Sequence, residues 1–157
     1  MKTWAGFLTF GLLACLGSVA WGEEGGEPVV VYSTRSGFEE VIENIKLAVT
    51  ERGLLVSGTL HVSEMLNRTG PDLGFPKAVY AKAESVEFCS ATLSHRMIAV
   101  DPRNLVVCPF TVAAYVLADQ PDRVYVAYRK LQLAGAATEE TRAVMSLLDE
   151  VARAGAE

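Results

Sequence analysis

The stretch LVVCPFTVAAYVLADQPDRVYVAYRKL, residues 105–131, decides the fold of this chain. Residues 105–117 are rich in β-branched and aromatic side chains and predict a strand, in which Pro109 implies an edge or a bulge because proline cannot donate to a strand ladder. The turn residues at 119–122 connect it to residues 123–131, whose alternation predicts the second half of a hairpin. One face of that second strand carries Val124, Val126 and Tyr128.

Two amphipathic helices are predicted to cover one side of this sheet. Ser36 and Glu39 have capping-box spacing at the start of the first helix, and Gly53 is placed to end it. The apolar face between them comprises Phe38, Val41, Ile42, Ile45, Ala48 and Val49. Thr138 is the predicted N-cap of a final helix. The apolar face of that helix comprises Val144, Leu147, Leu148 and Val151.

The segments between these elements add shorter ones. Residues 29–32, 54–62 and 78–89 predict strands, residues 63–68 a short helical turn and residues 92–100 a short helix. Alternation places Leu54, Val56, Leu60 and Val62 on the buried face of the second strand, and His61 on its solvated face. The hairpin connections and the half-polar strands predict an α+β domain: an antiparallel sheet with helices packed on one face, in the order β-α-β-β-β-β-α.

The chain begins with the pattern of an export signal. Residues 5–20 form an apolar run after the single charge of Lys2, and Ala20-Trp21-Gly22 is a plausible cleavage site. Removing residues 1–22 leaves 157 − 22 = 135 residues, with residues 23–28 as a tether and residues 29–155 as a single domain. We expect a periplasmic or secreted protein in which Cys15 is lost with the signal.

Charge excludes some classes of partner. Without Lys2 the count of Lys and Arg falls from 14 to 13 against 19 Asp and Glu, so the mature charge is 13 − 19 = −6. An acidic domain without a basic run is a poor match for nucleic acid or for an anionic membrane surface. The partners that remain are a small ligand, a periplasmic protein or a second copy of the chain, with no membrane contact after signal cleavage.

Several short blocks follow one another in order over residues 30–131: GFEE (37–40), MLNRT (65–69), FCSA (88–91), SHRM (94–97), DPRN (101–104), VCPF (107–110) and VAAY (112–115). Together they resemble the family called domain of unknown function 302. The resemblance implies a TATA-binding-protein-like fold with a curved antiparallel sheet, and no secure activity. Exported members suggest a link to sulfur or respiratory redox metabolism. The family tends to place a cysteine just after the proline; here that residue is Phe110, and Cys108 precedes Pro109.

Cys89 and Cys108 are the two cysteines outside the signal, which favours a disulfide in an exported chain. In the entropy model, closing a loop of this length stabilises by about 3 kcal/mol. Strand periodicity opposes the bond, because Cys108 is in phase with Phe110 whereas Cys89 is out of phase with Phe88. A bulge at Pro109 would reset the phase, so the sequence leaves the disulfide open.

A metal or haem site is the second hypothesis. Cys89, His95, Met97 and Cys108 are soft or nitrogen ligands that suit copper, His61 could add a second imidazole, and His95 could be an axial ligand of non-covalent haem. Helical spacing separates His95 from Met97 by about 200°, which predicts Met97 in the core and His95 exposed.

A thiol-dependent enzyme is the third hypothesis, with Cys89 or Cys108 activated by His95 near Arg96 and Arg103. We expect binding rather than catalysis. The predicted binding surface surrounds His95, includes Ser94 and Arg96, and opens between Cys89, the short helix and the bulge at Pro109. A disulfide-stapled interaction domain without a cofactor is the alternative.

Overall fold

The computed structural model describes residues 27–157, so the predicted signal peptide, Cys15 and most of the tether lie outside the described residues. Its sheet has five strands in the order β1-β5-β4-β3-β2, and every neighbouring pair is antiparallel. The strands are β1 Val29–Thr34, β2 Leu55–Leu60, β3 Tyr80–Cys89, β4 Phe110–Leu117 and β5 Gln120–Arg129.

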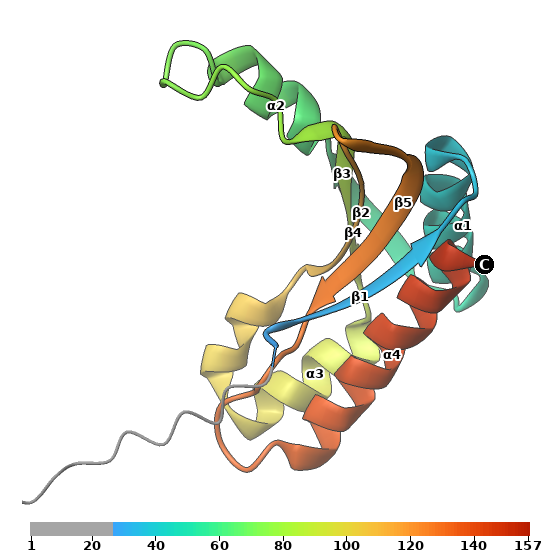
Figure 1. The fold of residues 1–157 in the computed structure, drawn as a ribbon. Helices are drawn as coiled ribbons and strands as arrows, with labels where there is room; N and C mark the ends of the chain where they lie inside the picture. Colours follow the sequence, from blue (N-terminus) through green and yellow to red (C-terminus); the bar gives the residue numbers. More distant parts are fainter. Residues whose placement is uncertain (1–26) are drawn as a thin grey trace, which may run out of the picture.

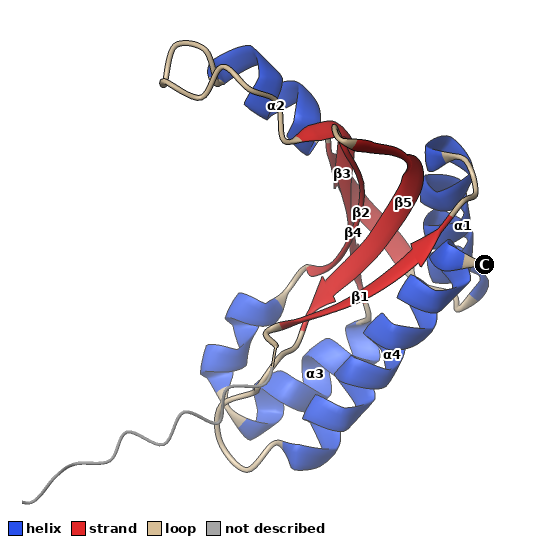
Figure 2. Ribbon diagram, in the orientation of Figure 1, coloured by secondary structure: helices blue, strands red, loops and turns tan. Residues whose placement is uncertain are grey.

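The helices divide into a covering pair and two outlying groups (Figures 1 and 2). Helices α1, Phe38–Glu51, and α4, Thr138–Ala156, lie side by side against one face of the sheet. Helix α3, Ala91–Val100, and the 3₁₀ helix η1, Pro102–Val107, pack at one end, while α2, Val62–Thr69, projects from the other. The predicted α+β class is confirmed. None of the helices within residues 27–157 has the length and apolarity needed to cross a membrane.

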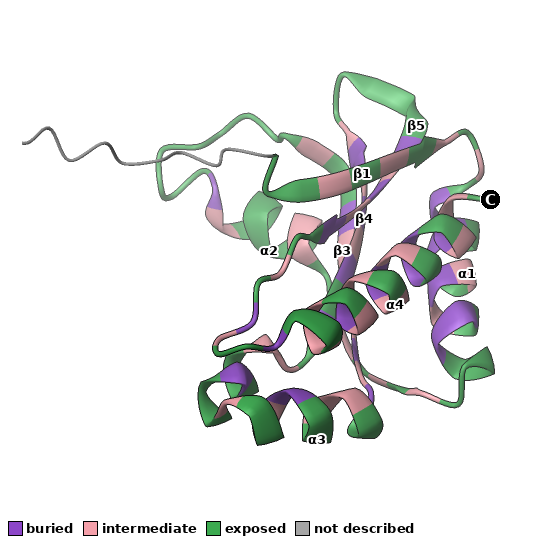
Figure 3. Cartoon of the chain, turned by 90° about the horizontal axis from the view of Figure 1, so that it is seen from below, coloured by how far each residue is buried: buried purple, intermediate pink, exposed green. Residues whose placement is uncertain are grey.

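The core lies between α1, α4 and the sheet, as the predicted apolar faces require. All six apolar residues predicted for the first helix are buried, and Val144, Leu148 and Val151 of α4 join them, with Leu147 packed at the edge. Buried residues alternate with more exposed ones along β4 and also occur on α1 and α4 (Figure 3). The sheet contributes Val86, Phe88, Phe110, Val112, Ala114, Val116, Val124, Val126 and Tyr128.

The helix termini depart from the predicted caps. Gly37 is the N-cap of α1, and Ser36 contacts the hydroxyl of Thr34 instead of capping, so the predicted capping box is wrong. Thr138 is the first residue of α4 rather than its cap. Gly53 does end α1 as predicted: its φ of 68° is one that glycine adopts without strain, and its N–H bonds the Thr50 carbonyl at 2.9 Å.

The largest departure concerns the predicted strand over residues 105–117. Residues 105–107 belong to η1, and β4 starts only at Phe110, so Pro109 precedes the strand instead of forming a bulge in it. The Asp101 side chain caps η1 by accepting from the Arg103 N–H at 2.9 Å, and Pro102 fits its first turn. The alternation of a strand therefore does not hold across Pro109, because Val106 is 88% exposed whereas Phe110 is only 1% exposed.

Two smaller corrections concern strand register. A bulge between Val56 and Gly58 shifts the phase of β2, so Leu60 is exposed rather than buried, and Val62 already belongs to α2. In the β4–β5 hairpin Leu117 pairs with Gln120, which confines the turn to residues 118–119 and places the predicted turn residues 120–122 inside β5.

The sheet surface turned away from α1 and α4 is called the open face below. Alternation places there the residues of β4 and β5 that lie between the buried ones. They are Thr111, Ala113, Tyr115, Tyr125, Ala127 and Arg129. The open face and the helix-covered face thus share the same two strands.

Candidate functional site

The two cysteines lie close to one another without a bond between them. Cys89 is the last residue of β3, and Cys108 lies between η1 and β4, joined to Pro109 by a cis peptide bond. Both thiols are free and half-buried. Because Phe88 pairs with Phe110 across β3 and β4, the chain brings the segments that carry the two thiols to the same end of the sheet.

The surroundings of Cys89 disfavour its thiolate. Burial raises the pKa of the Cys89 thiol, and the neighbouring Cys108 thiol and Glu87 carboxylate raise it further. A nucleophilic cysteine needs the opposite, a pKa lowered by nearby positive charge. The arginines predicted to supply that charge are engaged elsewhere: Arg96 bonds Glu139 at 2.6 Å and Glu140 at 3.2 Å, and Arg103 bonds Asp101 at 2.7 Å.

The residues predicted around His95 have separate roles. The Ser94 hydroxyl lies 3.2 Å from the Cys108 sulfur, so Ser94 and Cys108 do come together. His95 is exposed on α3, as predicted. Arg96 joins α3 to the first turn of α4 through its two glutamates, which is a structural role rather than a free binding surface.

The predicted metal ligands do not form one set. Met97 is fully buried in the core, as its helical phase predicted, whereas His95 points to solvent. Within residues 27–157, no three His, Cys, Asp or Glu side chains are grouped as a metal ion requires. His61 bonds Glu84 at 3.1 Å, and Glu84 precedes Cys89 by five residues on β3, about 17 Å by strand rise.

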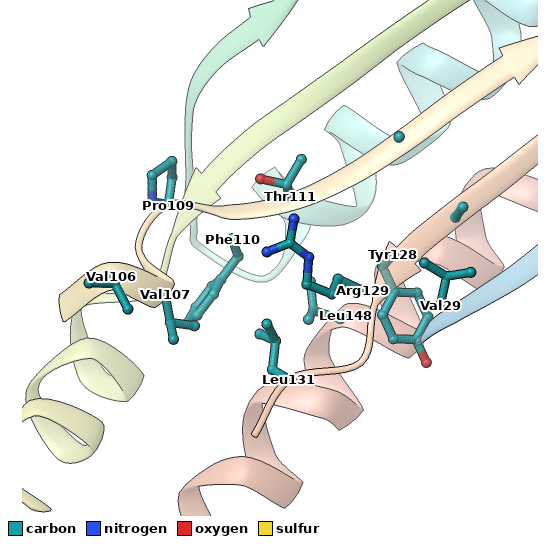
Figure 4. Close-up of a pocket in the computed structure, with 12 residues that line it drawn as sticks. Val29, Val106, Val107, Pro109, Phe110, Thr111, Tyr128, Arg129, Leu131 and Leu148 are labelled. Carbon is teal, nitrogen blue, oxygen red and sulfur yellow. The ribbon is translucent and has the colours of Figure 1, made fainter. Parts of the chain in front are cut away.

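A cavity of about 450 Å³ lies where β4 begins and β5 ends. We call it the Pro109 cavity (Figure 4). Its walls come from η1, β4, β5, α4 and the first residue of β1, and they are mostly apolar. The lining residues are Val29, Val106, Val107, Pro109, Phe110, Thr111, Ala113, Ala127, Tyr128, Arg129, Leu131 and Leu148. Neither cysteine nor His95 is among them, so this cavity is not the binding surface predicted around His95, and Pro109 is the part of that predicted surface that lines it.

The core fixes one wall of the Pro109 cavity. Phe110 and Leu148 are each 1% exposed, and the Tyr128 hydroxyl donates to Asp149 at 2.8 Å. Burial, and then the bond to Asp149, raises the pKa of Tyr128, so this hydroxyl stays neutral at physiological pH.

A second cavity of about 530 Å³ lies against α2, but its walls include Leu73 and Phe75, which are 67% and 74% exposed, and α2 has no buried residue. The Pro109 cavity therefore has the better preformed wall.

Arg129 and Thr111 line the Pro109 cavity with polar side chains that bond no other side chain of the described residues. Val112 pairs with Tyr128 in antiparallel strands, so Thr111, the residue before Val112, and Arg129, the residue after Tyr128, lie side by side on the open face. In Figure 4 the Arg129 guanidinium lies among the side chains that line the cavity, near Thr111. No hydrogen bond or ion pair within the described residues engages this guanidinium.

The sequence held a signal for this site that periodicity alone could have used. The alternation that buries Val126 and Tyr128 sets Ala127 and Arg129 on the opposite face, beside Ala113 of the neighbouring strand. The small side chains of Ala113 and Ala127 leave room beside Arg129 on this uncovered face. The reading of residues 105–108 as strand concealed it, because only η1 places Val106 and Val107 as a wall.

The sequence pattern of the family described as "Domain of unknown function DUF302" matches residues 29–155. This chain belongs to the DUF302 family. The crystal structure of an uncharacterized conserved DUF302 protein from Bacillus stearothermophilus superimposes with a TM-score of 0.64 at 12% sequence identity, over 84% of this chain and 100% of that one. At this identity the likeness shows a shared fold. No curated protein matches the chain.

Family membership accounts for the fold and leaves the chemistry to the residues. The DUF302 match covers the sheet, the covering helices and both cysteines, so the Pro109 cavity and the thiol pair lie inside the family domain. The residues around these two features must therefore carry any functional conclusion.

Proposed function

We propose that this DUF302 protein is exported and binds a small, mostly apolar molecule in the Pro109 cavity. The observation that carries the proposal is the cavity itself: about 450 Å³, with mostly apolar walls from five elements and a back wall of core residues. That volume is within the range of roughly 300–1,000 Å³ typical of small-molecule sites. The apolar segment at residues 5–20 and the basic Lys2 support export.

The walls favour an apolar ligand over a metal complex or haem bound by side chains. No cysteine, histidine or methionine lines the cavity, whereas valine, leucine, alanine and phenylalanine do. Burying an apolar group releases about 0.8 kcal/mol per CH₂, so a chain of several carbons supplies useful affinity without any covalent or metal bond. An exported accessory protein that carries or senses such a molecule fits this chemistry.

A cavity-filling variant tests the proposal. Ala113 faces the cavity from the open face, so Ala113→Phe should fill it without entering the core. We expect isothermal titration calorimetry to show 1-octanol and octanoate binding to the wild-type protein and at least a tenfold loss in Ala113→Phe. Ser33→Phe, on the exposed side of β1 outside the cavity, is the matched control and should bind as wild type. No binding by wild type, or equal binding by Ala113→Phe, would overturn the proposal.

A second candidate function rests on the thiol pair. We propose that Cys89 and Cys108 form a reversible disulfide after export. Their segments meet at one end of the sheet, and each thiol is half-buried but free. The reaction removes two electrons and two protons from the thiols and forms one S–S bond, with a disulfide-type thiol oxidant taking up the electrons. The raised pKa of Cys89 favours this pairing over an activated single thiolate.

Intact mass spectrometry of protein from its native compartment tests the second candidate and export together. We expect a chain that lacks residues 1–22, with a mass two hydrogens below the reduced value and no alkylation until a reductant is added. Cys89→Ala should leave Cys108 open to alkylation at once. Alkylation of both cysteines without reductant would exclude the disulfide, and a mass that includes residues 1–22 would exclude cleavage at the expected site.

A further inference from the structure

We infer that the ligand of the Pro109 cavity ends in a carboxylate and that Arg129 binds that group. The inference rests on the proposed function and adds the chemical class of the molecule. The site combines an apolar hollow with a single cationic side chain beside a hydroxyl. That combination fits an amphipathic monocarboxylate, such as a short or medium-chain fatty acid.

The strand register puts Arg129 at the rim. Arg129 is the last residue of β5 and pairs with Val29 of β1. Thr111 is its neighbour on β4, and both line the cavity together with Ala113 and Ala127. Ala113 and Ala127 end at Cβ and leave room beside Arg129, whose guanidinium lies near Thr111 among the labelled lining side chains (Figure 4).

No protein carboxylate neutralises this guanidinium within residues 27–157. Glu87 is the acidic side chain in the same row, since it pairs with Thr111 on the side of β4 away from Arg129. Two strand spacings, about 10 Å, separate the two backbones, and no ion pair joins the side chains. Four of the nine arginines within residues 27–157, Arg52, Arg96, Arg103 and Arg153, each bond a carboxylate. Arg129 is one of the five that do not, and it is the one that lines the Pro109 cavity, so its donors are available to a ligand there.

The geometry of arginine favours a carboxylate over other polar ends. A guanidinium presents parallel N–H donors that match the two oxygens of a carboxylate, and the Thr111 hydroxyl can donate to the same group. The chain as a whole is acidic, so no long-range field draws anions to the site. Selection of a carboxylate would therefore come from the contact with Arg129 itself, partly screened by salt at this exposed rim.

Two probes of equal chain length separate the apolar and the ionic contributions. We expect wild-type protein to bind octanoate about tenfold more tightly than 1-octanol in calorimetry at pH 7. Arg129→Met keeps the apolar stem and removes the charge, so it should bind both probes with the affinity that wild type has for 1-octanol. Arg129→Lys keeps the charge but loses the paired N–H donors of the guanidinium, and it should retain part of the preference for octanoate over 1-octanol. Arg123→Met, on the same strand outside the cavity, is the matched control and should retain all of it.

The outcomes distinguish the inference from the proposed function. A preference for octanoate that disappears in Arg129→Met and persists in Arg123→Met supports the carboxylate site. Equal binding of octanoate and 1-octanol by wild type, or an unchanged preference in Arg129→Met, overturns the inference and leaves the apolar cavity standing. If wild type binds neither probe, the proposed function fails and the inference fails with it. The preference should also decline as pH falls through about 4–5, where the carboxylate takes up a proton.

Discussion

The two faces of β4 and β5 differ in their side chains, although alternate residues of the same two strands form both faces. The face toward α1 and α4 carries Phe110, Val112, Val126 and Tyr128, all nearly without solvent exposure. The open face carries small or polar side chains and the cavity rim. Packing dictates the first set, because close-packed neighbours leave no volume to spare. No contact within residues 27–157 dictates Arg129, and the proposed carboxylate site gives this residue a role.

Aromatic pairs show the same contrast. On the covered face Phe88 and Phe110 meet edge to face, with centroids 6.0 Å apart and both rings buried. On the open face Tyr115 and Tyr125 stack with centroids 5.1 Å apart and remain partly exposed. The two ring contacts contribute different amounts to stability, because the covered pair removes more apolar surface from water.

The largest expected effect follows from that contrast. Phe88→Ala removes a fully buried ring and should lower the free energy of unfolding by about 3–5 kcal/mol. Tyr125→Ala removes a cross-strand stack on the open face and should lower it by about 1 kcal/mol or less. Urea denaturation followed by circular dichroism measures both. Equal losses would remove the distinction between the two faces.

Asn104 is expected to follow, because it joins η1 to the chain before α4. Its amide donates to the Met97 carbonyl at 2.8 Å and accepts from the Ala134 N–H at 2.7 Å, and the side chain is buried. Asn104→Ala leaves those backbone groups unpaired and should cost about 2 kcal/mol in the same denaturation experiment. Asn67→Ala, in exposed α2, is the control and should change stability by less than about 0.5 kcal/mol. A loss no larger than that of the control would show that the wall formed by η1 does not depend on Asn104.

Substitutions of the neighbouring residues Thr111 and Val112, which point to opposite faces of β4, compare the two faces directly. Val112→Thr places a hydroxyl in the core and should cost about 1–2 kcal/mol, whereas Thr111→Val, on the open face, should change stability by about 0.5 kcal/mol or less. Thr111→Val should also weaken octanoate binding a few-fold if its hydroxyl contacts the carboxylate. Similar stability losses in the two variants would contradict the assigned directions of the two side chains.

The smallest expected effect concerns Asp149, whose carboxylate accepts from the hydroxyls of Tyr32 and Tyr128 at the edge of the covered face. The bond from Arg153 lowers the pKa of Asp149 most, followed by the bond from Tyr32. Asp149 therefore stabilises the folded state above its unfolded pKa of about 4, and this contribution is lost as pH falls through the lower folded value.

Denaturation from pH 7 to pH 2 checks this sign. Because Asp149 is partly exposed, Asp149→Asn should reduce stability at pH 7 by under about 1 kcal/mol, and the difference from wild type should shrink as the pH falls. Asp72→Asn, in the exposed loop after α2, should follow wild type throughout. A difference that grows toward low pH would contradict the assigned interaction.

Sequence periodicity was sufficient where one principle acted alone. The face of α1, the burial of Met97 and the exposure of His95 follow from helical spacing, and Gly53 follows from its backbone freedom. Periodicity failed at residues 105–107, where three β-branched or leucine residues suggested a strand but the Asp101-Pro102 start signal produced η1. A local start signal overrode strand propensity, because the bonds of Asn104 hold η1 against α3.

The site was predicted less well than the fold for a related reason. The sequence directed attention to Cys89, His95, Met97 and Cys108, whose residue types carry chemistry on their own. A cavity instead arises from the shape that several elements make together, and its valines and alanines are unremarkable one at a time. The sequence did draw attention to Pro109, although as an edge or bulge in a strand; Pro109 instead precedes β4 and lines the cavity.

A nuclear magnetic resonance titration of ¹⁵N-labelled protein with octanoate tests the central claim most directly, because it reports where a ligand binds. We expect progressive, saturable shifts in the amide signals of Thr111, Ala113, Ala127 and Arg129, with little change in α2. Shifts confined to α2 and the loop after it, or no saturable shift at the four cavity residues, would contradict a binding site in the Pro109 cavity.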